Sequence, residues 1–504
     1  MPRTSHRRRV SRIAGSAVAL AMLVPASVAG IAQSAPSQPA DGPPLHFMVI
    51  GPPGSGLAQT EDSVESTGGT VVQSWPQIGV VVATSQDTAF AEQLRGQPGV
   101  QQAGVSRDFA ELVPSPPAAQ THAAKGMEPL EGTVEPPASA TADGEPLEPE
   151  QWDMPAIKAA EAHAVSQGSK DTVVGILDYG IDPQHPDLKP NLDVSKSVSC
   201  VDEGVPNQDV EAWAPTDETQ AHGSHVAGTV GAARNDVGIA GVAPNVTLAS
   251  VRVVSDEGFI FPEFAVCGFM WAAEQGFEVT NNSWFVDPWY LWCDRDPDQK
   301  AVAEGVRRAV EYSQSKDVVN VAAAGNSNWD LSKPIRDTNS PNHGGPTQDR
   351  RTGPDCHKLP AELPGVVTTS STGVDDVKSY FSNYGIQSID VTAPGGDANQ
   401  IPDTPSKNGR VLSTIPGGGW GWMQGTSMAS PHAAGVLALI RSTHPEMTAQ
   451  QAMGVLKGQA DPVPCPTHYD PDGDGKPDAV CNGGATGAGF YGAGMVDALD
   501  AVHG

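Results

Sequence analysis

Residues 173–188 read VVGILDYGIDPQHPDL, a short apolar run followed by an acid, an aromatic residue and a glycine. A near-continuous apolar run of this length predicts a strand that is buried on both faces, which is typical of parallel sheets. Open α/β sheets place their functional groups at the carboxyl ends of such strands, where Asp178 stands. Asp178 is therefore a candidate functional group, although an Asp in this position can equally serve a turn alone.

The same pattern repeats along residues 151–504, where β-branched runs alternate with Ala-rich amphipathic runs. We expect strands at 172–177, 248–253, 279–283, 318–323 and 366–370. We expect helices at 222–231, 262–275, 299–315, 430–442 and 448–457. Such alternation predicts an α/β domain with a mostly parallel sheet flanked by helices.

Residues 45–113 predict a separate, small α+β domain. Its strands are expected at 45–50, 71–74, 80–84 and 100–105, with a helix at 88–95. The following segment, 114–150, holds eight prolines and six glutamates and no aromatic residue. Because this composition cannot bury a core, we expect an extended, flexible linker before the large domain at 151–504.

The first 35 residues have the composition of an export signal. Three arginines at 7–9 precede a weakly apolar run at 13–31, and small residues near Ala29 or Ala35 offer cleavage sites. The alternative is a retained membrane anchor. It is disfavoured because Gly, Ser and Pro interrupt a run that is already short for a membrane span. We therefore expect a secreted, extracellular protein with a bacterial export signal and no stable membrane anchor.

The chain carries 30 Lys and Arg against 59 Asp and Glu, which gives a formal net charge of -29 at pH 7. This balance argues against a nucleic-acid partner, because binding phosphate needs a basic surface. An acidic surface keeps a protein soluble, and it can also bind cations such as calcium. The hydrophobic share of 38% excludes a wholly disordered chain.

Two further motifs carry candidate chemistry. His222-Gly-Ser-His225 opens a helix of small residues, and Ser427 stands at the mouth of a second, Ala-rich helix. No Glu separates the two histidines, so the HExxH zinc motif is absent. A serine hydroxyl becomes a nucleophile when a histidine takes its proton and an acid holds that histidine. Asp178, His222 and Ser427 together are therefore more specific than any one of them alone.

The large domain resembles the subtilisin-like serine proteases in six segments that follow the order of that family. The segments are VVGILDYGIDPQHPDL, AHGSHVAGTVGA, VGIAGVAPN, VVNVAAAGNSN, DVTAPGG and GTSMASPHAAG. The resemblance implies that Ser427 is the nucleophile, that His222 is the general acid and base, and that Asp178 orients the imidazole. It also implies that the Asn326 amide joins the Ser427 N–H in binding the oxyanion, and that His225 is a buried packing residue.

By size, position and pattern, the small domain at 45–113 resembles the inhibitory propeptides of the same family. In that family the propeptide aids folding, occupies the active-site cleft and is then cut off, so we expect the cut within 114–150. A non-cleaved accessory domain is the alternative. The expected partners are thus a protein or peptide substrate and the chain's own propeptide, and we expect a monomer.

The chain departs from the family pattern near the expected substrate pocket. Ser283-Trp284-Phe285 replaces the usual Ser-Leu-Gly in a strand that forms one wall of the primary specificity pocket. We place Gly325 in the same substrate-binding set. Phe285 should fill space near the pocket, so we expect a narrower specificity than that of a general digestive subtilisin. The aromatic residues inserted at 287–299 either wall the cleft or form a self-packed surface loop.

The resemblance further implies structural calcium and no organic cofactor. Asp187 and Asn235 match the side chains of the family's calcium site, which the carbonyl groups of Ala233, Val237 and Ile239 would complete. Separately, four acids stand at positions 1, 3, 5 and 9 of a stretch with Gly at position 6, as in an EF-hand-type loop. These acids are Asp470, Asp472, Asp474 and Asp478. Position 12 is not Glu, so this stretch is no EF-hand; it is either a calcium loop or an acidic surface turn.

All six cysteines lie in the large domain. An even number in an exported chain predicts up to three disulfides, with 15 possible pairings. We expect the pair Cys465–Cys481, because it would close the Asp-rich stretch and contribute about 3 kcal/mol to stability by loop entropy.

These observations predict a secreted serine endopeptidase that is made as a self-processed precursor. One alternative is a dedicated precursor-processing protease of narrow specificity. Another is a non-catalytic binding protein on the same fold, which the complete set of Asp178, His222, Asn326 and Ser427 argues against. An esterase is a weaker option, since an activated serine also attacks esters.

Overall fold

The computed structural model describes residues 44–107, 130, 132–136, 144–343 and 346–503. The expected export signal at 1–35 lies outside the described residues. Within these described ranges, no helix is long and apolar enough to cross a membrane.

An eight-stranded sheet forms the centre of the large domain, in the order β17-β16-β12-β10-β6-β9-β7-β8. Every neighbouring pair is parallel except β7 and β8 at one edge. The strands are β6 (Val173–Asp178), β7 (Val198–Asp202), β8 (Val205–Asn207), β9 (Thr247–Arg252), β10 (Val279–Asn282), β12 (Val319–Ala323), β16 (Val366–Thr372) and β17 (Val391–Pro394). The predicted α/β fold with a mostly parallel sheet is confirmed.

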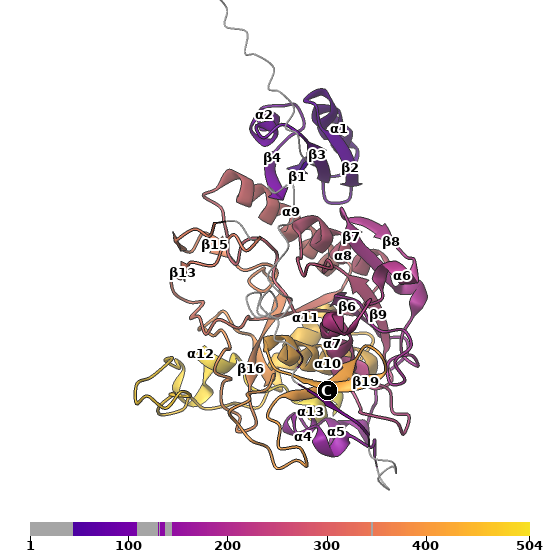
Figure 1. The fold of residues 1–504 in the computed structure, drawn as a ribbon, viewed down its shortest axis with the longest axis vertical. Helices are drawn as coiled ribbons and strands as arrows, with labels where there is room; N and C mark the ends of the chain where they lie inside the picture. Colours follow the sequence, from indigo (N-terminus) through magenta and orange to yellow (C-terminus); the bar gives the residue numbers. More distant parts are fainter. Residues whose placement is uncertain (1–43, 108–129, 131, 137–143, 344–345, 504) are drawn as a thin grey trace, which may run out of the picture. The chain divides into compact units, whose positions relative to one another are not determined.

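Helices cover both faces of this sheet, as the alternation in the sequence predicts (Figure 1). One face carries α7 (Ala221–Gly231), α10 (Thr426–Thr443), α11 (Ala449–Gly458) and α13 (Ala498–His503). The other carries α8 (Pro262–Glu274) and α9 (Pro297–Ser315). Side chains of β6 alternate between the two layers: Val174 and Ile176 join the α10 side, and Leu177 joins the α8 side. This burial on both faces explains the continuous apolar run.

A four-stranded antiparallel sheet forms the small N-terminal domain, in the order β2-β3-β1-β4. Its elements are β1 (Leu45–Ile50), α1 (Leu57–Ser66), β2 (Thr70–Trp75), β3 (Val80–Ser85), α2 (Phe90–Leu94) and β4 (Gln102–Arg107). In Figure 1, α8 and α9 lie between this sheet and the large one. Helix α1 was not predicted, because its buried face is half polar: the Thr60 and Ser63 hydroxyls donate to backbone carbonyls.

Part of the expected linker packs against the large domain. Strand β5 (Thr133–Val134) adds to β18 (Val411–Ile415) and β19 (Gly419–Met423) as a third strand. Residues 144–150 are mostly buried, and Leu147 packs in a cluster with Trp420. The prediction of an extended linker over 114–150 is therefore wrong at its C-terminal end, where a few apolar and acidic side chains pack against the large domain.

The remaining short elements connect these layers. They are α4 (Asp153–Ala156), α5 (Ala159–His163), α6 (Val210–Trp213), α12 (Ala488–Tyr491), β11 (Trp292–Cys293), β13 (Arg336–Asp337), β14 (Arg350–Arg351) and β15 (Cys356–His357).

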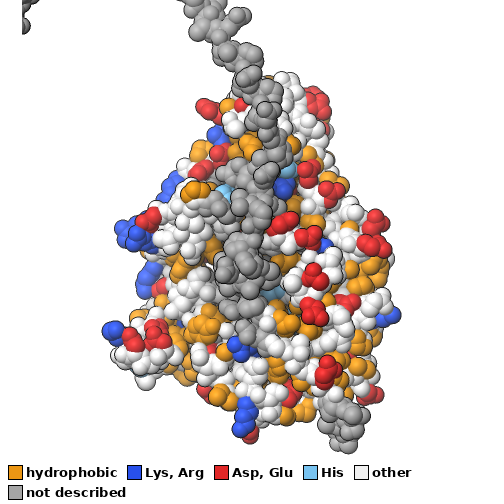
Figure 2. Space-filling view, viewed as in Figure 1, with side chains coloured by type: hydrophobic (Ala, Val, Ile, Leu, Met, Phe, Trp, Pro, Cys, Tyr) orange, Lys and Arg blue, Asp and Glu red, His pale blue; other side chains and the backbone are white. Residues whose placement is uncertain are grey.

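Three disulfides are present, and the predicted Cys465–Cys481 bond is one of them. The others join Cys200 to Cys267 and Cys293 to Cys356. Acidic side chains are spread over the face of the molecule drawn in Figure 2. The negative net charge is thus not confined to one segment on that face.

Candidate active site

The sequence-predicted site residues meet where three neighbouring strands end. Strand β6 ends at Asp178, Ser283 follows β10, and Asn326 lies three residues after β12. The carboxyl ends of parallel strands lie at one edge of a sheet, so these residues are brought together although they are far apart in sequence. Two helices of the same face supply the rest, because His222 and Ser427 stand in the first turns of α7 and α10.

Asp178 and His222 form a buried pair. His222 Nδ1 lies 2.9 Å from each carboxylate oxygen of Asp178, and Asp178 Oδ1 also accepts the backbone N–H of Tyr179 at 2.8 Å. An Nδ1–H that donates to a carboxylate leaves Nε2 as the basic nitrogen of a neutral ring. That Nε2 is buried and makes no hydrogen bond to any described residue. The imidazole is therefore held at one nitrogen and available at the other.

Gly223 allows α7 to approach the end of β6 closely. A Cβ at this position would lie 2.3 Å from the carbonyl oxygen of Gly180 and 3.2 Å from the Cβ of Asp178. No side chain larger than hydrogen fits there without a shift of the backbone. The glycine next to His222 is thus what places the histidine against the acid.

Ser427 is fixed by its contacts with Ser283. Pro431 has no N–H, so the carbonyl of Ser427 lacks the helical donor four residues later. The Ser283 hydroxyl donates to that carbonyl at 2.8 Å instead, while Ser427 Oγ donates to the Ser283 carbonyl at 3.2 Å. Among the described residues, no hydrogen bond joins Ser427 Oγ to His222 Nε2.

The Asn326 side chain is oriented by Thr426. Its Oδ1 accepts the Thr426 backbone N–H at 2.9 Å and the Thr426 hydroxyl at 2.8 Å. A Cβ on Gly425 (φ +150°) would lie 3.2 Å from Asn326 Nδ2 and 3.5 Å from Ser427 N. The space over Gly425 is therefore bordered by two N–H donors, and only glycine leaves it open.

His225, one turn after His222, is fully buried, as predicted for a packing residue. Its Nε2 lies 3.2 Å from the carbonyl oxygens of Val411 and Gly421, which tie α7 to β18 and β19. Burial lowers its pKa to about 3, so the ring is neutral.

The side chains of the expected substrate wall differ in what they do. The Trp284 side chain packs into the core, where its Nε1 donates to the Leu177 carbonyl at 2.6 Å, and the residue also borders the cavity beside Ser427. Phe285 stacks on Tyr290 with ring centroids 4.4 Å apart. Tyr290 comes from the aromatic insert, which therefore walls the pocket. A small cavity of about 20 Å³ remains. Its lining residues are Ser283, Trp284, Phe285, Tyr290, Ala323, Gly325, Asn326, Ser327, Lys358, Thr426 and Ser427.

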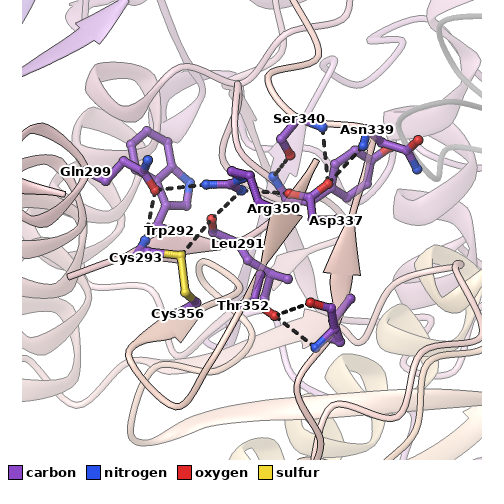
Figure 3. A network of polar contacts seen from close by, with 12 residues as sticks. Leu291, Trp292, Cys293, Gln299, Asp337, Asn339, Ser340, Arg350, Thr352 and Cys356 are labelled. Carbon is purple, nitrogen blue, oxygen red and sulfur yellow. Dashed lines mark hydrogen bonds and ion pairs between the residues drawn. A yellow bond between two sulfur atoms is a disulfide. The ribbon is translucent and has the colours of Figure 1, made fainter. Parts of the chain in front are cut away.

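A polar network fixes the insert (Figure 3). Arg350 donates to the Asp337 carboxylate at 2.6 Å and to the Leu291 carbonyl at 3.0 Å. Ser340, next in the network, accepts the backbone N–H of Tyr290 at 2.9 Å. The disulfide between Cys293 and Cys356 joins β11 to β15. The pocket wall is thus anchored covalently and by ion pairing.

Sequence reasoning missed one residue of this pocket, Lys358. It follows β15, is 3% exposed, and its Nζ lies 4.9 Å from the Phe285 ring centroid. Burial lowers its pKa to about 8. No motif marks this lysine, and only the tertiary fold brings it to Ser427.

Asp187 and Asn235, the expected calcium ligands, lie at one site with a third residue, Glu145. Asp187 Oδ2 accepts the backbone N–H of Ile239 at 3.0 Å, whereas its Oδ1 is buried and has no hydrogen-bond partner among the residues that the structure describes. Glu145 accepts the N–H groups of Asn235 and Val237, and burial together with the nearby Asp187 charge raises its pKa. A buried, unpartnered carboxylate oxygen beside a second carboxylate fits a calcium ion. The N–H groups of Ala233, Val237 and Ile239 all donate to Asp187 or Glu145, and the role of their carbonyl groups as calcium ligands stays a prediction.

The Asp-rich stretch brings three of its four acids together. The carboxylates of Asp470, Asp472 and Asp478 have oxygens within 4.8 Å of one another; Asp472 and Asp478 are exposed and Asp470 is partly buried. The carboxylate of Asp474 is outside this group and pairs with Lys476 at 2.8 Å, while the Asp474 backbone N–H donates to the carboxylates of Asp470 and Asp472. The assignment of Asp474 as a calcium ligand stays a prediction.

Comparison with known sequences places the chain among proteases. The model of the subtilase family (Peptidase_S8) matches residues 169–492. Subtilisin NAT of Bacillus subtilis subsp. natto is 25% identical over 406 residues, which cover 80% of this chain and 81% of that protein. Subtilisin DY of Bacillus licheniformis is 30% identical over 309 residues, which cover 61% of this chain and 90% of that protein.

Solved structures show the same fold. The epidermin leader peptide processing serine protease of Staphylococcus aureus superposes with a TM-score of 0.66 at 22% identity, covering 92% of this chain and 98% of that one. Fervidolysin of Fervidobacterium pennivorans, a keratinolytic enzyme related to subtilisin, gives a TM-score of 0.60 at 22% identity and covers 93% of this chain and 62% of that one.

Proposed function

This chain belongs to the subtilase family of serine-type peptidases, and we propose that it is a secreted endopeptidase that cuts peptide bonds through Ser427, His222 and Asp178. The observation that carries the proposal is the buried pairing of Asp178 with His222 Nδ1 at 2.9 Å. It leaves Nε2 without a partner among the described residues, at the strand ends where Ser427 also lies.

In the first half-reaction, the Ser427 hydroxyl turns from the Ser283 carbonyl toward His222 Nε2 as a peptide binds. Nε2 takes the hydroxyl proton while Oγ attacks the peptide carbonyl carbon. The imidazole becomes positively charged, and the Asp178 carboxylate stabilises that charge without taking the proton. His222 then gives the proton to the leaving amine, and an acyl group remains on Ser427.

The oxygen of the attacked carbonyl gains negative charge over Gly425. Asn326 Nδ2 and the Ser427 backbone N–H border this space and would donate to it. The N-terminus of α10 adds a favourable field. A donor of this kind typically contributes about 10²–10³ in rate. In the second half-reaction, His222 Nε2 takes a proton from water while the water oxygen attacks the acyl carbon. His222 then returns the proton to Ser427 Oγ as the acyl group leaves.

We propose that residues 45–107 belong to an inhibitory propeptide. This unit packs apolar side chains against α9, where Gly305 makes room for Met48: a Cβ there would lie 1.9 Å from the Met48 sulfur. Arg308 of α9 donates to the carbonyls of Gly51 and Ile78 at 2.8 and 3.0 Å. The contact between the two parts thus combines apolar packing with hydrogen bonds to the backbone, as specific protein interfaces do.

The maturation cut is proposed upstream of Gly144. Glu145 and Leu147 are buried against the large domain, so a chain cut before them keeps these contacts. The site of Asp187, Asn235 and Glu145 would hold a structural calcium ion in the mature enzyme. A second calcium ion is proposed at Asp470, Asp472 and Asp478. Calcium would supply stability and no chemistry to the reaction.

The test compares the full precursor with its Ser427→Ala variant, which removes only one oxygen atom. Chain mass is followed over time, and a fluorophosphonate probe reports an activated serine. Shortening and labelling of the wild type alone would support the proposal. A wild type that labels without shortening would leave the serine active and assign maturation to another enzyme. If the probe labels neither chain, even after removal of the first 113 residues in calcium buffer, the result would favour a non-catalytic binding protein on the same fold.

The aromatic side chains in the pocket favour a protease of narrow substrate specificity, which processes one precursor protein. Phe285 and Tyr290 leave only about 20 Å³ beside Ser427. Activity on unfolded casein measured against activity on folded proteins would separate a general protease from a processing enzyme. Rapid hydrolysis of casein at many positions would exclude the narrow version.

A further inference from the structure

We propose that the pocket beside Ser427 takes an acidic side chain, and that the enzyme therefore cuts after Asp or Glu, with Lys358 as the residue that sets this preference. The inference rests on the proposed endopeptidase function. It assigns a substrate class to the same site.

Because of its position, this pocket would bind the side chain of the substrate residue that precedes the scissile bond. It is bordered by Asn326 and Ser427, whose N–H groups would hold the attacked carbonyl oxygen. The residue that carries this carbonyl must then extend its side chain into the adjoining cavity. Gly325 and Ser327 flank that cavity on the β12 side, and Phe285 and Tyr290 on the other.

Lys358 places an ammonium group in this cavity. A Cβ on Gly325 would lie 2.4 Å from Lys358 Nζ, so the ammonium approaches the backbone next to Asn326. The aromatic faces of Phe285 and Tyr290 lie 4.9 and 6.0 Å away. Aromatic faces attract a cation but do not neutralise it.

The ammonium has no anionic partner in the part of the chain that the structure describes. No ion pair or hydrogen bond of Nζ is formed there. The nearby Glu362 instead accepts the backbone N–H of Lys358 at 2.7 Å. A buried charge is costly unless it is paired, and most buried lysines have a carboxylate neighbour. Here the missing carboxylate would come from the substrate.

The lysine cannot easily leave the pocket. Its backbone follows β15, which the Cys293–Cys356 disulfide and the pairing with β11 hold against the insert. Arg350, which forms an ion pair with Asp337, holds the same insert by donating to the Leu291 carbonyl (Figure 3). A fixed cation at the pocket favours a carboxylate over a neutral amide of equal size, and the little remaining space disfavours a large aromatic side chain.

The experiment measures kcat/KM of the mature enzyme on quenched peptides that differ only in the residue before the scissile bond. The set contains Asp, Asn, Glu, Gln, Leu, Phe and Lys. Asp over Asn, or Glu over Gln, should be favoured at least ~10-fold, because a pocket built for a polar group rejects an analogue that leaves this group unpaired. This comparison needs no variant, so it stands even if substitutions at the pocket fail to fold.

Two variants then assign the preference to Lys358. Lys358→Met keeps the length of the side chain and removes its charge, so the acid-over-amide ratio should fall to about one. Lys358→Arg should retain the preference for acids. Lys189→Met, at an exposed lysine far from the pocket in sequence, is the matched control and should change nothing.

The outcomes separate this inference from the proposed function. An enzyme that labels with fluorophosphonate and cuts best after Leu or Phe, with Lys358→Met unchanged in preference, would overturn the inference and leave the protease intact. An enzyme that neither labels nor cuts any peptide would overturn the proposed function, and the inference with it.

Discussion

The hydroxyl of Ser283 donates a 2.8 Å hydrogen bond to the carbonyl oxygen of Ser427. Pro431 removes the helical donor for this carbonyl, so Ser283 takes the place of a backbone N–H inside the first turn of α10. The link joins the end of β10 to the candidate nucleophile. Ser283, which also borders the cavity, thus holds the backbone of Ser427 in place.

Ser283→Ala should weaken both folding and catalysis. The buried Ser427 carbonyl would lose its donor, which costs about 1–3 kcal/mol in the free energy of unfolding. Urea unfolding measures this loss, and kcat should fall while KM changes little. Ser315→Ala, at an exposed hydroxyl in the last turn of α9, is the control. An unchanged kcat together with unchanged stability would show that the bond does not position Ser427.

Asn326→Leu removes a hydrogen-bond donor and keeps a similar volume. We expect kcat to fall about 10²–10³-fold with little change in KM, because the amide would donate to charge that develops only in the transition state. Steady-state kinetics measures the split, with Asn245→Ala at an exposed asparagine as the control. A rise in KM at constant kcat would assign Asn326 to ground-state binding instead.

The preference for acidic residues should depend on pH. Burial lowers the pKa of Lys358 to about 8, and the facing Glu362 partly opposes this shift. The ammonium form binds a carboxylate, so the ratio of kcat/KM for Asp over Asn peptides should be high below pH 8 and fall as the pH rises through that value. Taking the ratio cancels the ionisation of groups that act on both peptides, such as His222. A ratio that stays constant from pH 6 to 10 would contradict a role for this lysine.

Loss of the Cys293–Cys356 bond should affect both stability and selectivity. The bond closes a separation of 63 residues, and loop entropy gives it roughly 3–5 kcal/mol. Replacing both cysteines by Ala should lower the melting temperature and reduce the preference for acids, because β15 carries Lys358. The matched control replaces Cys465 and Cys481, which should cost stability without changing selectivity. Equal selectivity in both double variants would show that the bond does not hold the pocket.

Calcium should stabilise the folded protein. Chelation should lower the melting temperature, since an ion that binds only the native state adds RT ln(1 + [L]/Kd) to its stability. Asp187→Asn should remove most of this response, and any remainder in that variant would belong to the group of Asp470, Asp472 and Asp478. Melting curves that coincide in chelator and in calcium would exclude a stabilising ion at either place.

The predictions made from sequence are most accurate where a residue pattern and a chemical role coincide. The strand before Asp178 and the helices that begin near His222 and Ser427 lie close to where the apolar periodicity puts them. Helix α1 escaped prediction because hydroxyl groups of Thr60 and Ser63 form half of its buried face. The Pro- and Glu-rich composition of residues 144–150 predicts a linker, whereas Glu145 and Leu147 are buried against the large domain.

The α/β sheet, the family resemblance and the candidate set of Asp178, His222, Asn326 and Ser427 could all be predicted from the sequence, because each stands in a local pattern with a physical reason. The positions of Trp284 in the core and of Lys358 at the pocket could not be predicted in this way. Both outcomes depend on contacts between segments far apart in the chain. The insert carrying Tyr290 and the strand that precedes Lys358 meet through a disulfide and a sheet pairing that no local pattern specifies.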